Sequence, residues 1–298
     1  IGTQGQVVVF APLASRTYGD PAITLAASGG ASGNAINYTS SNTEVATLNG
    51  STFTIIGAGT STITASQAGS ANYGAATPMS RTLSVSPKQV TGTFAVSNKS
   101  YDGNTSAQIV SRSLTGVLAS DLAEVNLTGG SASFADANVG LAKGVTPAGM
   151  TLAGSRAANY TLVGTSGTTA DIVPKAITVT ADSKTKTYGE IDPALTFSVP
   201  SGSLLGGDAV TGTLSRTAGN LAGSYPISIG TLSAGRNYSI TFVAANLTIV
   251  PKLLTVTADS KSRAFNTANP VLTVSYSGFA GTENAMALTS QPVISTTA

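Results

Sequence analysis

Hydrophobic and polar residues alternate in short runs along almost the whole chain. In residues 176–181 the side chains of Ile177, Val179 and Ala181 fall on one face, and threonines fall on the other. A period of two with β-branched residues, interrupted by Gly, Asn, Asp and Pro, is typical of antiparallel strands joined by turns. Similar runs occupy residues 7–10, 61–64, 225–229, 238–243 and 253–258. Because no stretch of about 12 residues combines a helical period with good helix formers, the sequence predicts an all-β fold.

The chain also repeats itself. Residues 172–184 read IVPKAITVTADSK, and residues 249–261 read IVPKLLTVTADSK, 77 residues further on. Pro-Lys pairs begin at Pro87, Pro174 and Pro251, and an Asn-Tyr pair precedes each of them, at residues 72–73, 159–160 and 237–238. This period is longer than that of solenoids and propellers and matches a small β-sandwich. The sequence therefore predicts tandem modules over residues 1–87, 88–174, 175–251 and 252–298, named here the first to fourth repeats.

Neighbouring repeats join without a flexible linker. The apolar run 246–250 passes through Pro251 and Lys252 into the next run, and no Gly/Ser spacer separates them. Proline fixes its own φ and holds Val250 in an extended conformation. We therefore expect immunoglobulin-like β-sandwiches, each with its own core, arranged end to end as an elongated rod.

The fourth repeat is shorter than the others, because residues 252–298 lack the Asn-Tyr pair and the final strand runs. A half sandwich would leave an open sheet edge and an uncovered apolar face. Three explanations remain open: a cut chain, a continuation beyond residue 298, or completion by strands from another copy in a filament.

Composition excludes several classes of function. Charged residues make up only 9% of the chain, and 15 Lys and Arg against 13 Asp and Glu leave a net charge of +2 without a basic cluster, which argues against a nucleic-acid partner. The absence of Cys and His excludes disulfides and thiolate or imidazole zinc sites. No apolar run approaches the roughly 18 residues of a membrane helix, so membrane insertion is not expected.

One segment carries a family resemblance. Residues 99–107, KSYDGNTSA, resemble the YDG repeat of large bacterial surface proteins, with further matches at residues 114–117, 134–140 and 158–160. The turns YGDP, YGEIDP and FNTANP of the other three repeats are similar to those of MBG modules, which are glycine-rich and Ig-like. The resemblance implies a repeat region of a secreted bacterial adhesin or filament, usually a stalk, and it offers no catalytic residues.

An aromatic residue stands at the same turn of every repeat. These residues are Tyr18, Tyr101, Tyr188 and Phe265. One interpretation is a surface on which a ligand stacks. The other, which we favour, is that each ring closes one end of its own sandwich, since a residue present in every repeat meets a need of every repeat. In the Asn-Tyr pairs we expect Tyr to pack and Asn to close a turn.

Acidic residues in turns raise the possibility of calcium, which needs six to eight oxygen ligands. They are Asp20, Asp102, Asp136, Glu190, Asp192 and Asp208. Their scatter favours turn formation instead. An isopeptide crosslink through Lys184 or Lys261 is disfavoured because strand ends place Lys in water. No cofactor or metal is expected.

Catalytic patterns are equally weak. Ser183 and Lys186 match the S-x-x-K pattern of serine acyl enzymes, which belongs on a helix N-terminus, whereas a strand-end turn is expected here. Residues 57–59 place two glycines between strands without a helix to hold a phosphate. Glycosylation patterns at Asn37, Asn126 and Asn246 follow from the composition. We expect no catalytic residue and no enzymatic activity, and a glycoside hydrolase is improbable because the carboxylates are scattered.

Two functional hypotheses follow. The first is a structural stalk segment of a bacterial extracellular adhesin or filament at the cell surface, whose partners are neighbouring repeats and other copies of the chain. The second is a module that binds glycans or a host protein through loops at the ends of the sandwiches. Buried turn aromatics favour the stalk, and an exposed aromatic groove favours binding.

Overall fold

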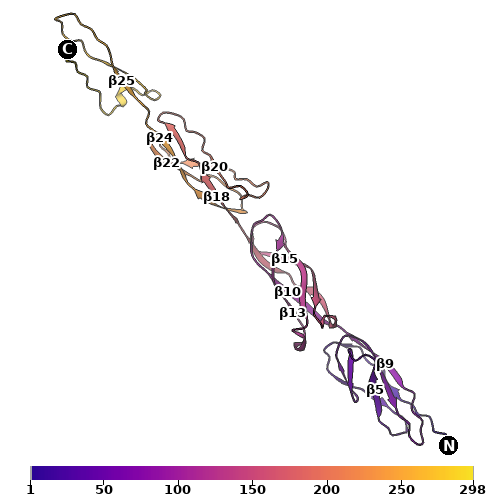
Figure 1. Cartoon of the computed structure of the whole chain (residues 1–298). Coiled ribbons are helices and arrows are strands. Elements are labelled where there is room, and N and C mark those ends of the chain that lie inside the picture. Colours follow the sequence, from indigo (N-terminus) through magenta and orange to yellow (C-terminus); the bar gives the residue numbers. More distant parts are fainter. Residues whose placement is uncertain (1, 298) are drawn as a thin grey trace. The chain divides into compact units, whose positions relative to one another are not determined.

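The computed structural model describes residues 2–297 and consists of short strands and turns (Figure 1). The described residues contain three short 3-10 turns but no α-helix, so the all-β prediction is confirmed. The 3-10 turns are η1 (Ala119–Asp121), η2 (Ala157–Asn159) and η3 (Ala285–Ala287). Contacts divide the chain into two compact units. The first holds residues up to Lys99 together with Asn104–Val173, and the second holds Ser100–Gly103 together with residues from Pro174 onward.

The first repeat forms three small sheets around buried apolar side chains. The strand orders are β1 (Val9–Phe10) with β4 (Ala27–Ser28), then β2 (Arg16–Thr17), β9 (Met79–Ser86), β8 (Gly59–Gln67) and β5 (Ile36–Ser40), and finally β3 (Ile23–Thr24), β7 (Thr52–Ile55) and β6 (Ala46–Asn49). Alternate residues of β8 and β9 face inward, so that Ile63 and Leu83 are fully buried. The period-two pattern of residues 61–64 is therefore confirmed as a strand of a half-buried sheet.

The second repeat has two sheets. One has the order β13 (Ile109–Thr115), β10 (Lys88–Val96) and β16 (Tyr160–Thr165), and the other β11 (Lys99–Ser100), β17 (Thr168–Val173), β15 (Gly140–Ala153), β14 (Asn126–Phe134) and β12 (Ser106–Ala107). Phe134 pairs with Val145 across the β14–β15 hairpin, and both side chains are buried.

The cores of the first two repeats are continuous, which differs from the expectation of one separate core per repeat. One hydrophobic cluster contains Leu83 and Val85 of β9 together with Val90 of β10, Val125 and Tyr160. The physical reason is that β9 runs through Pro87 directly into β10, so both strands place inward-facing residues on either side of the same short connection. The two repeats therefore share one set of apolar contacts across this connection.

The third repeat follows the same plan within the second unit. Its sheets have the orders β20 (Phe197–Ser198), β18 (Lys175–Ala181) and β23 (Tyr238–Val243), and β19 (Lys184–Thr187), β24 (Ala245–Val250), β22 (Gly223–Ser228) and β21 (Ser215–Arg216). Ile177, Val179 and Ala181 are buried on one face of β18, as the alternation predicts.

The fourth repeat contains one two-stranded sheet, β25 (Thr255–Ala258) with β26 (Val274–Ser277). All four residues of β25 are exposed, including Val256 at 42%. The equivalent positions of β18 are buried because a second sheet covers them, whereas the described residues of the fourth repeat supply no second sheet.

Several strand pairs are parallel, which corrects the expectation of antiparallel strands throughout. The parallel pairs are β2 with β9, β10 with β16, β18 with β23, and β19 with β24. Alternation along a strand reports which face is buried but carries no information on the direction of the neighbouring strand. In the third repeat the pairs place entry strand β18 and exit strand β24 beside parallel partners.

Candidate functional site

The aromatic turns of the first and third repeats are each fixed to the last strand of the same repeat. The backbone N–H of Tyr18 donates to the carbonyl of Ser86, and that of Tyr188 donates to the carbonyl of Val250, both at 2.9 Å. Ser86 and Val250 are the residues directly before the Pro-Lys pairs. The turn therefore lies where the chain leaves the repeat.

Acidic side chains close these turns locally. Asp20 accepts a hydrogen bond from the Thr17 N–H at 3.0 Å, and Glu190 accepts one from the Thr187 N–H at 2.7 Å. This is the turn-forming role expected for Asp in such positions. We call residues 17–20, 100–103 and 187–190 the tyrosine turns.

The ring of Tyr18 lies against the second repeat. Its hydroxyl donates to the Oδ2 atom of Asp121 at 2.7 Å, and the hydroxyl of Tyr160 donates to the same oxygen, also at 2.7 Å. The two rings meet edge to face, with centroids 5.5 Å apart and an interplanar angle of 84°. All three residues are buried. Asp121 and Tyr160 together receive the Tyr18 ring. We call such a pair, a carboxylate and a tyrosine that contact the tyrosine of an incoming turn, a tyrosine socket.

The socket is held by its own repeat. Asp121 ends η1, and its other oxygen, Oδ1, accepts from the Ser120 hydroxyl at 2.9 Å. The backbone N–H of Leu118 donates to the hydroxyl of Tyr160 at 3.2 Å. The Tyr160 hydroxyl thus accepts from one backbone group and donates to the carboxylate. The socket is polar but fully hydrogen-bonded, as burial requires.

Two further contacts join the first and second repeats. The Oδ1 atom of Asn159 accepts from the backbone N–H of Ala58 at 2.8 Å, and the Nη1 atom of Arg156 donates to the carbonyl of Ile56 at 3.0 Å. The expectation that the Asn of this pair closes a turn of its own repeat is therefore wrong for the Asn159 side chain. Glycines at residues 57 and 59 lie beside this contact, which gives the glycine pair a structural role.

A similar but more open socket occurs in the second unit, where Tyr238 is buried and Asp208 is exposed. The hydroxyl of Tyr238 donates to the Oδ2 atom of Asp208 at 2.6 Å and accepts from the Leu205 N–H at 2.9 Å. The hydroxyl of Tyr101 lies 3.4 Å from the same carboxylate oxygen, and the two rings meet edge to face at 5.5 Å and 80°. Both sockets follow the pattern Leu-x-x-Asp, at residues 118–121 and 205–208. This shared spacing is the sequence signal by which the two acids can be found.

Tyr188 has a different receiving site. Its hydroxyl donates a very short hydrogen bond to Glu283, and the other carboxylate oxygen of Glu283 accepts from the Ala280 N–H at 3.4 Å. Gly189 lies close to Ala280, because a Cβ built on Gly189 would be 2.4 Å from the Ala280 Cβ. Phe265, at the equivalent turn of the fourth repeat, is 92% exposed.

Burial and hydrogen bonding shift the pKa values of the socket groups. Burial, and then the hydrogen bond to Asp121, raise the pKa of Tyr160 to about 12 and also raise that of Tyr18. Burial acts to raise the pKa of Asp121, but the hydrogen bonds from Tyr160, Tyr18 and Ser120 outweigh it, and the pKa is lowered. The carboxylate is therefore charged and both tyrosines are protonated near neutral pH.

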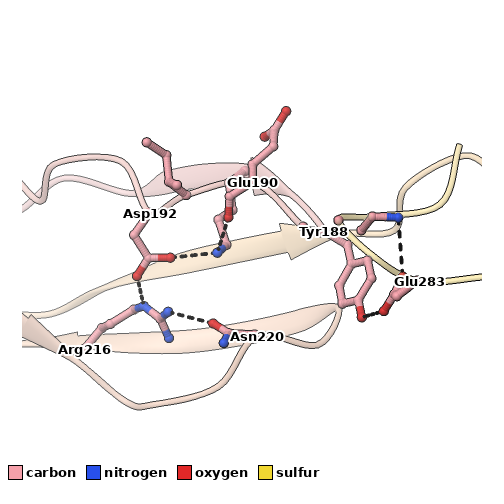
Figure 2. A pocket seen from close by; sticks show the side chains of 11 residues that line it. Tyr188, Glu190, Asp192, Arg216, Asn220 and Glu283 are labelled. Carbon is pink, nitrogen blue, oxygen red and sulfur yellow. Dashed lines mark hydrogen bonds and ion pairs between the residues drawn. The ribbon is translucent and has the colours of Figure 1, made fainter.

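A hollow of about 480 Å³ lies beside the Tyr188 turn (Figure 2). Within it Asp192 bridges two cations, at 2.7 Å from the Lys186 Nζ and 2.6 Å from the Arg216 Nε. The hydrogen bonds from Arg216 and Lys186 lower the pKa of Asp192 to about 2. Figure 2 shows Arg216 between Asp192 and Asn220, with Tyr188 facing Glu283 on the other side of the hollow.

The structure places the residues predicted from the sequence as follows. The expectation that each turn aromatic closes its own sandwich is wrong for Tyr18, because the turn is fixed to the exit strand and its hydroxyl reaches Asp121.

Of the calcium candidates, Asp136 pairs with Lys143 at 2.7 Å and Asp102 lies in an exposed turn. Lys184 lies in β19, Lys261 is exposed, and Ser183 precedes β19. No group of three or more potential metal-ligating side chains occurs among residues 2–297. In the same range no helix is long and apolar enough to span a membrane.

Comparisons with known proteins identify two domain types. Residues 86–170 match the YDG domain, and residues 177–248 and 254–298 match the MBG domain (YGX type). No curated protein matches the chain. A solved structure of Bacteroides ovatus mixed-linkage glucan utilization locus SGBP-B, in complex with a mixed-linkage heptasaccharide, is 10% identical over 89% of this chain and 76% of that chain. Its TM-score of 0.23 is too low to carry an argument. The chain is therefore a repeat protein that contains a YDG domain and two segments matching the MBG domain.

Proposed function

We propose that this chain is a structural, non-enzymatic stalk segment of a bacterial extracellular adhesin or filament, in which immunoglobulin-like repeats follow one another end to end as a rod. The observation that carries the proposal is the placement of the turn aromatics. Tyr18 is buried in a socket of the following repeat, where its hydroxyl is bound by Asp121. An aromatic surface for ligand stacking requires the ring to be exposed.

The strand pairing supports the same proposal. In the third repeat, β19 pairs in parallel with β24 over four residues, and the chain leaves the repeat at the end of β24. A pull on the two ends loads these hydrogen bonds together along the strand axis instead of opening them one after another. Such an arrangement suits an element that carries tension.

Small-angle X-ray scattering of the 298-residue chain tests this function. A stalk segment gives the profile of a rod, with a cross-section close to that of one repeat. A compact profile, with a radius of gyration near that of a globule of equal mass, contradicts the proposal. A variant that combines Tyr18→Ala with Tyr188→Ala is expected to keep its strand content and to give a more flexible profile.

A second candidate function is glycan binding, and the hollow beside Tyr188 is the observation that favours it. Its volume falls within the range of small-molecule sites, about 300–1,000 Å³. Asn220 lines it, and its side-chain amide carries donors of the kind that bind sugar hydroxyls, whereas Arg216 already donates to Asp192, Asn220 and two backbone carbonyls. Titration with soluble β-glucan and chitin oligosaccharides, followed by NMR, tests it. Shifts confined to this hollow, and abolished by Asn220→Ala, support binding, and an unchanged spectrum rejects it.

A further inference from the structure

In each socket the incoming tyrosine contacts the carboxylate through its hydroxyl group. In the sockets of Asp121 and Asp208 one carboxylate oxygen lies within hydrogen-bond distance of two tyrosines, one from the same repeat and one from an incoming turn. Tyr188 likewise donates to Glu283. The equivalent residue of the fourth repeat, Phe265, has no hydroxyl.

The Asp121 socket shows why the hydroxyl matters. This carboxylate is only 4% exposed, so protein groups must supply most of its hydrogen bonds. The Ser120 hydroxyl donates a hydrogen bond to Oδ1, and the Tyr160 hydroxyl donates one to Oδ2. The incoming Tyr18 hydroxyl supplies the second hydrogen bond to Oδ2. A phenylalanine turn would fill the same space but leave this part of a buried charge without a donor.

We propose that the buried carboxylate makes the Asp121 socket a selective binding site for a tyrosine turn, so that the turn residue of one repeat and a buried acid of the next determine which repeats can be neighbours. The partner that fits a socket is a preceding repeat with Tyr in a Thr-Tyr-Gly or Ser-Tyr-Asp turn. The Phe265 turn fits a site without a carboxylate and is rejected by sockets of the Asp121 type. This inference rests on the proposed stalk function and adds to it a rule for the order of repeats.

A double-mutant cycle at Tyr18 and Asp121 tests the selectivity. The backbone N–H of Ala58 reports docking, because its acceptor, Asn159, belongs to the next repeat. Amide hydrogens in β8 report folding of the first repeat. We expect Tyr18→Phe to speed exchange of the Ala58 amide about ten- to a hundredfold, because this substitution leaves a buried acceptor without its donor. The exchange rates of the β8 amides should stay unchanged. In an Asp121→Ala background the same change should alter exchange less than about threefold.

Matched variants keep the test interpretable. Tyr38→Phe removes a hydroxyl from a ring that packs against Phe10 in the same repeat, and it should not affect the Ala58 amide. If Asp121→Ala does not fold, Asp121→Asn replaces it, because it removes the charge and retains one acceptor oxygen. Equal effects of Tyr18→Phe in both backgrounds, or no effect with Asp121 present, overturn the proposal. A rod-like scattering profile with either of these results would leave the stalk function intact and reject the selectivity alone.

Discussion

The hydroxyl of Tyr18 donates a hydrogen bond of 2.7 Å to the carboxylate of Asp121, which lies 103 residues later in the chain. This contact joins the exit turn of one repeat to the entry side of the next. The same relationship recurs between Tyr188 and Glu283 within the second unit. The tyrosine turns of the first and third repeats therefore contact a carboxylate of the following repeat, and these turns are elements of the junctions.

The Asn159 side chain should contribute measurably to the junction of the first two repeats. Asn159→Ala removes the acceptor of the Ala58 N–H, and we expect it to lower the free energy of unfolding of the first unit by about 1 kcal/mol. Urea denaturation measures the change. Asn72→Ala is the matched control, since Asn72 holds the same position of its pair and is exposed. An equal loss in both variants would contradict the role of Asn159.

The socket should lose stability at alkaline pH. The pKa of Tyr160 is raised from 10.0 to about 12, so its contribution is fully present below pH 10 and is lost as the pH rises towards 12. The pKa of Asp121 is lowered, so its contribution is present above its ordinary value of 3.8 and is lost as the pH falls below it. Since the chain has no Trp, an absorbance titration follows its tyrosines directly.

In that titration Tyr160 should ionise near pH 12, and Tyr160→Phe should remove this late step. A wild-type curve without a step near pH 12 that Tyr160→Phe removes would contradict the burial and hydrogen bonding of the Tyr160 hydroxyl.

Glycine at position 189 should be required for the Tyr188 contact. Gly189 has a φ of +85°, and a Cβ there would lie 2.4 Å from the Ala280 Cβ. Gly189→Ala therefore combines backbone strain of about 1 kcal/mol with a collision. Gly202→Ala is the control, because Gly202 has a φ of +77° and open space around its Cβ position. We expect a larger fall in the melting temperature of the second unit for Gly189→Ala, and equal falls would show that Ala280 imposes no constraint.

The first two repeats should unfold together. Their hydrophobic cluster is continuous from Leu83 through Val90 to Tyr160, so Leu83→Ala should cost about 2–5 kcal/mol and should lower the stability of both. Scanning calorimetry with hydrogen exchange of β8 and β14 amides measures this. Ile249→Ala, a large-to-small change at a buried site of the second unit, is the control and should leave both sets of amides protected. Exchange in β8 with continued protection in β14 after Leu83→Ala would reject a shared core.

Much of the local structure was predictable because short-range alternation decides it. The run 238–243 is a strand over the same residues, and Ile177, Val179 and Ala181 are buried as their spacing requires. The junction residues were also visible, since Tyr18 and Asn159 recur at fixed places in the repeats. The contacts that these two residues make could not be predicted, because recurrence of a residue in every repeat does not show which repeat supplies its partner.

The sequence by itself determined the all-β class, the repeating plan and the absence of thiol and imidazole chemistry, because composition and a period of two are local properties. Only the tertiary structure decided that Tyr18 meets Asp121, that Asn159 reaches Ala58, and that entry and exit strands have parallel partners. The physical reason is that these contacts join residues about 60 to 100 positions apart, and the path of the exit strand brings them together. No local pattern of side chains specifies that path.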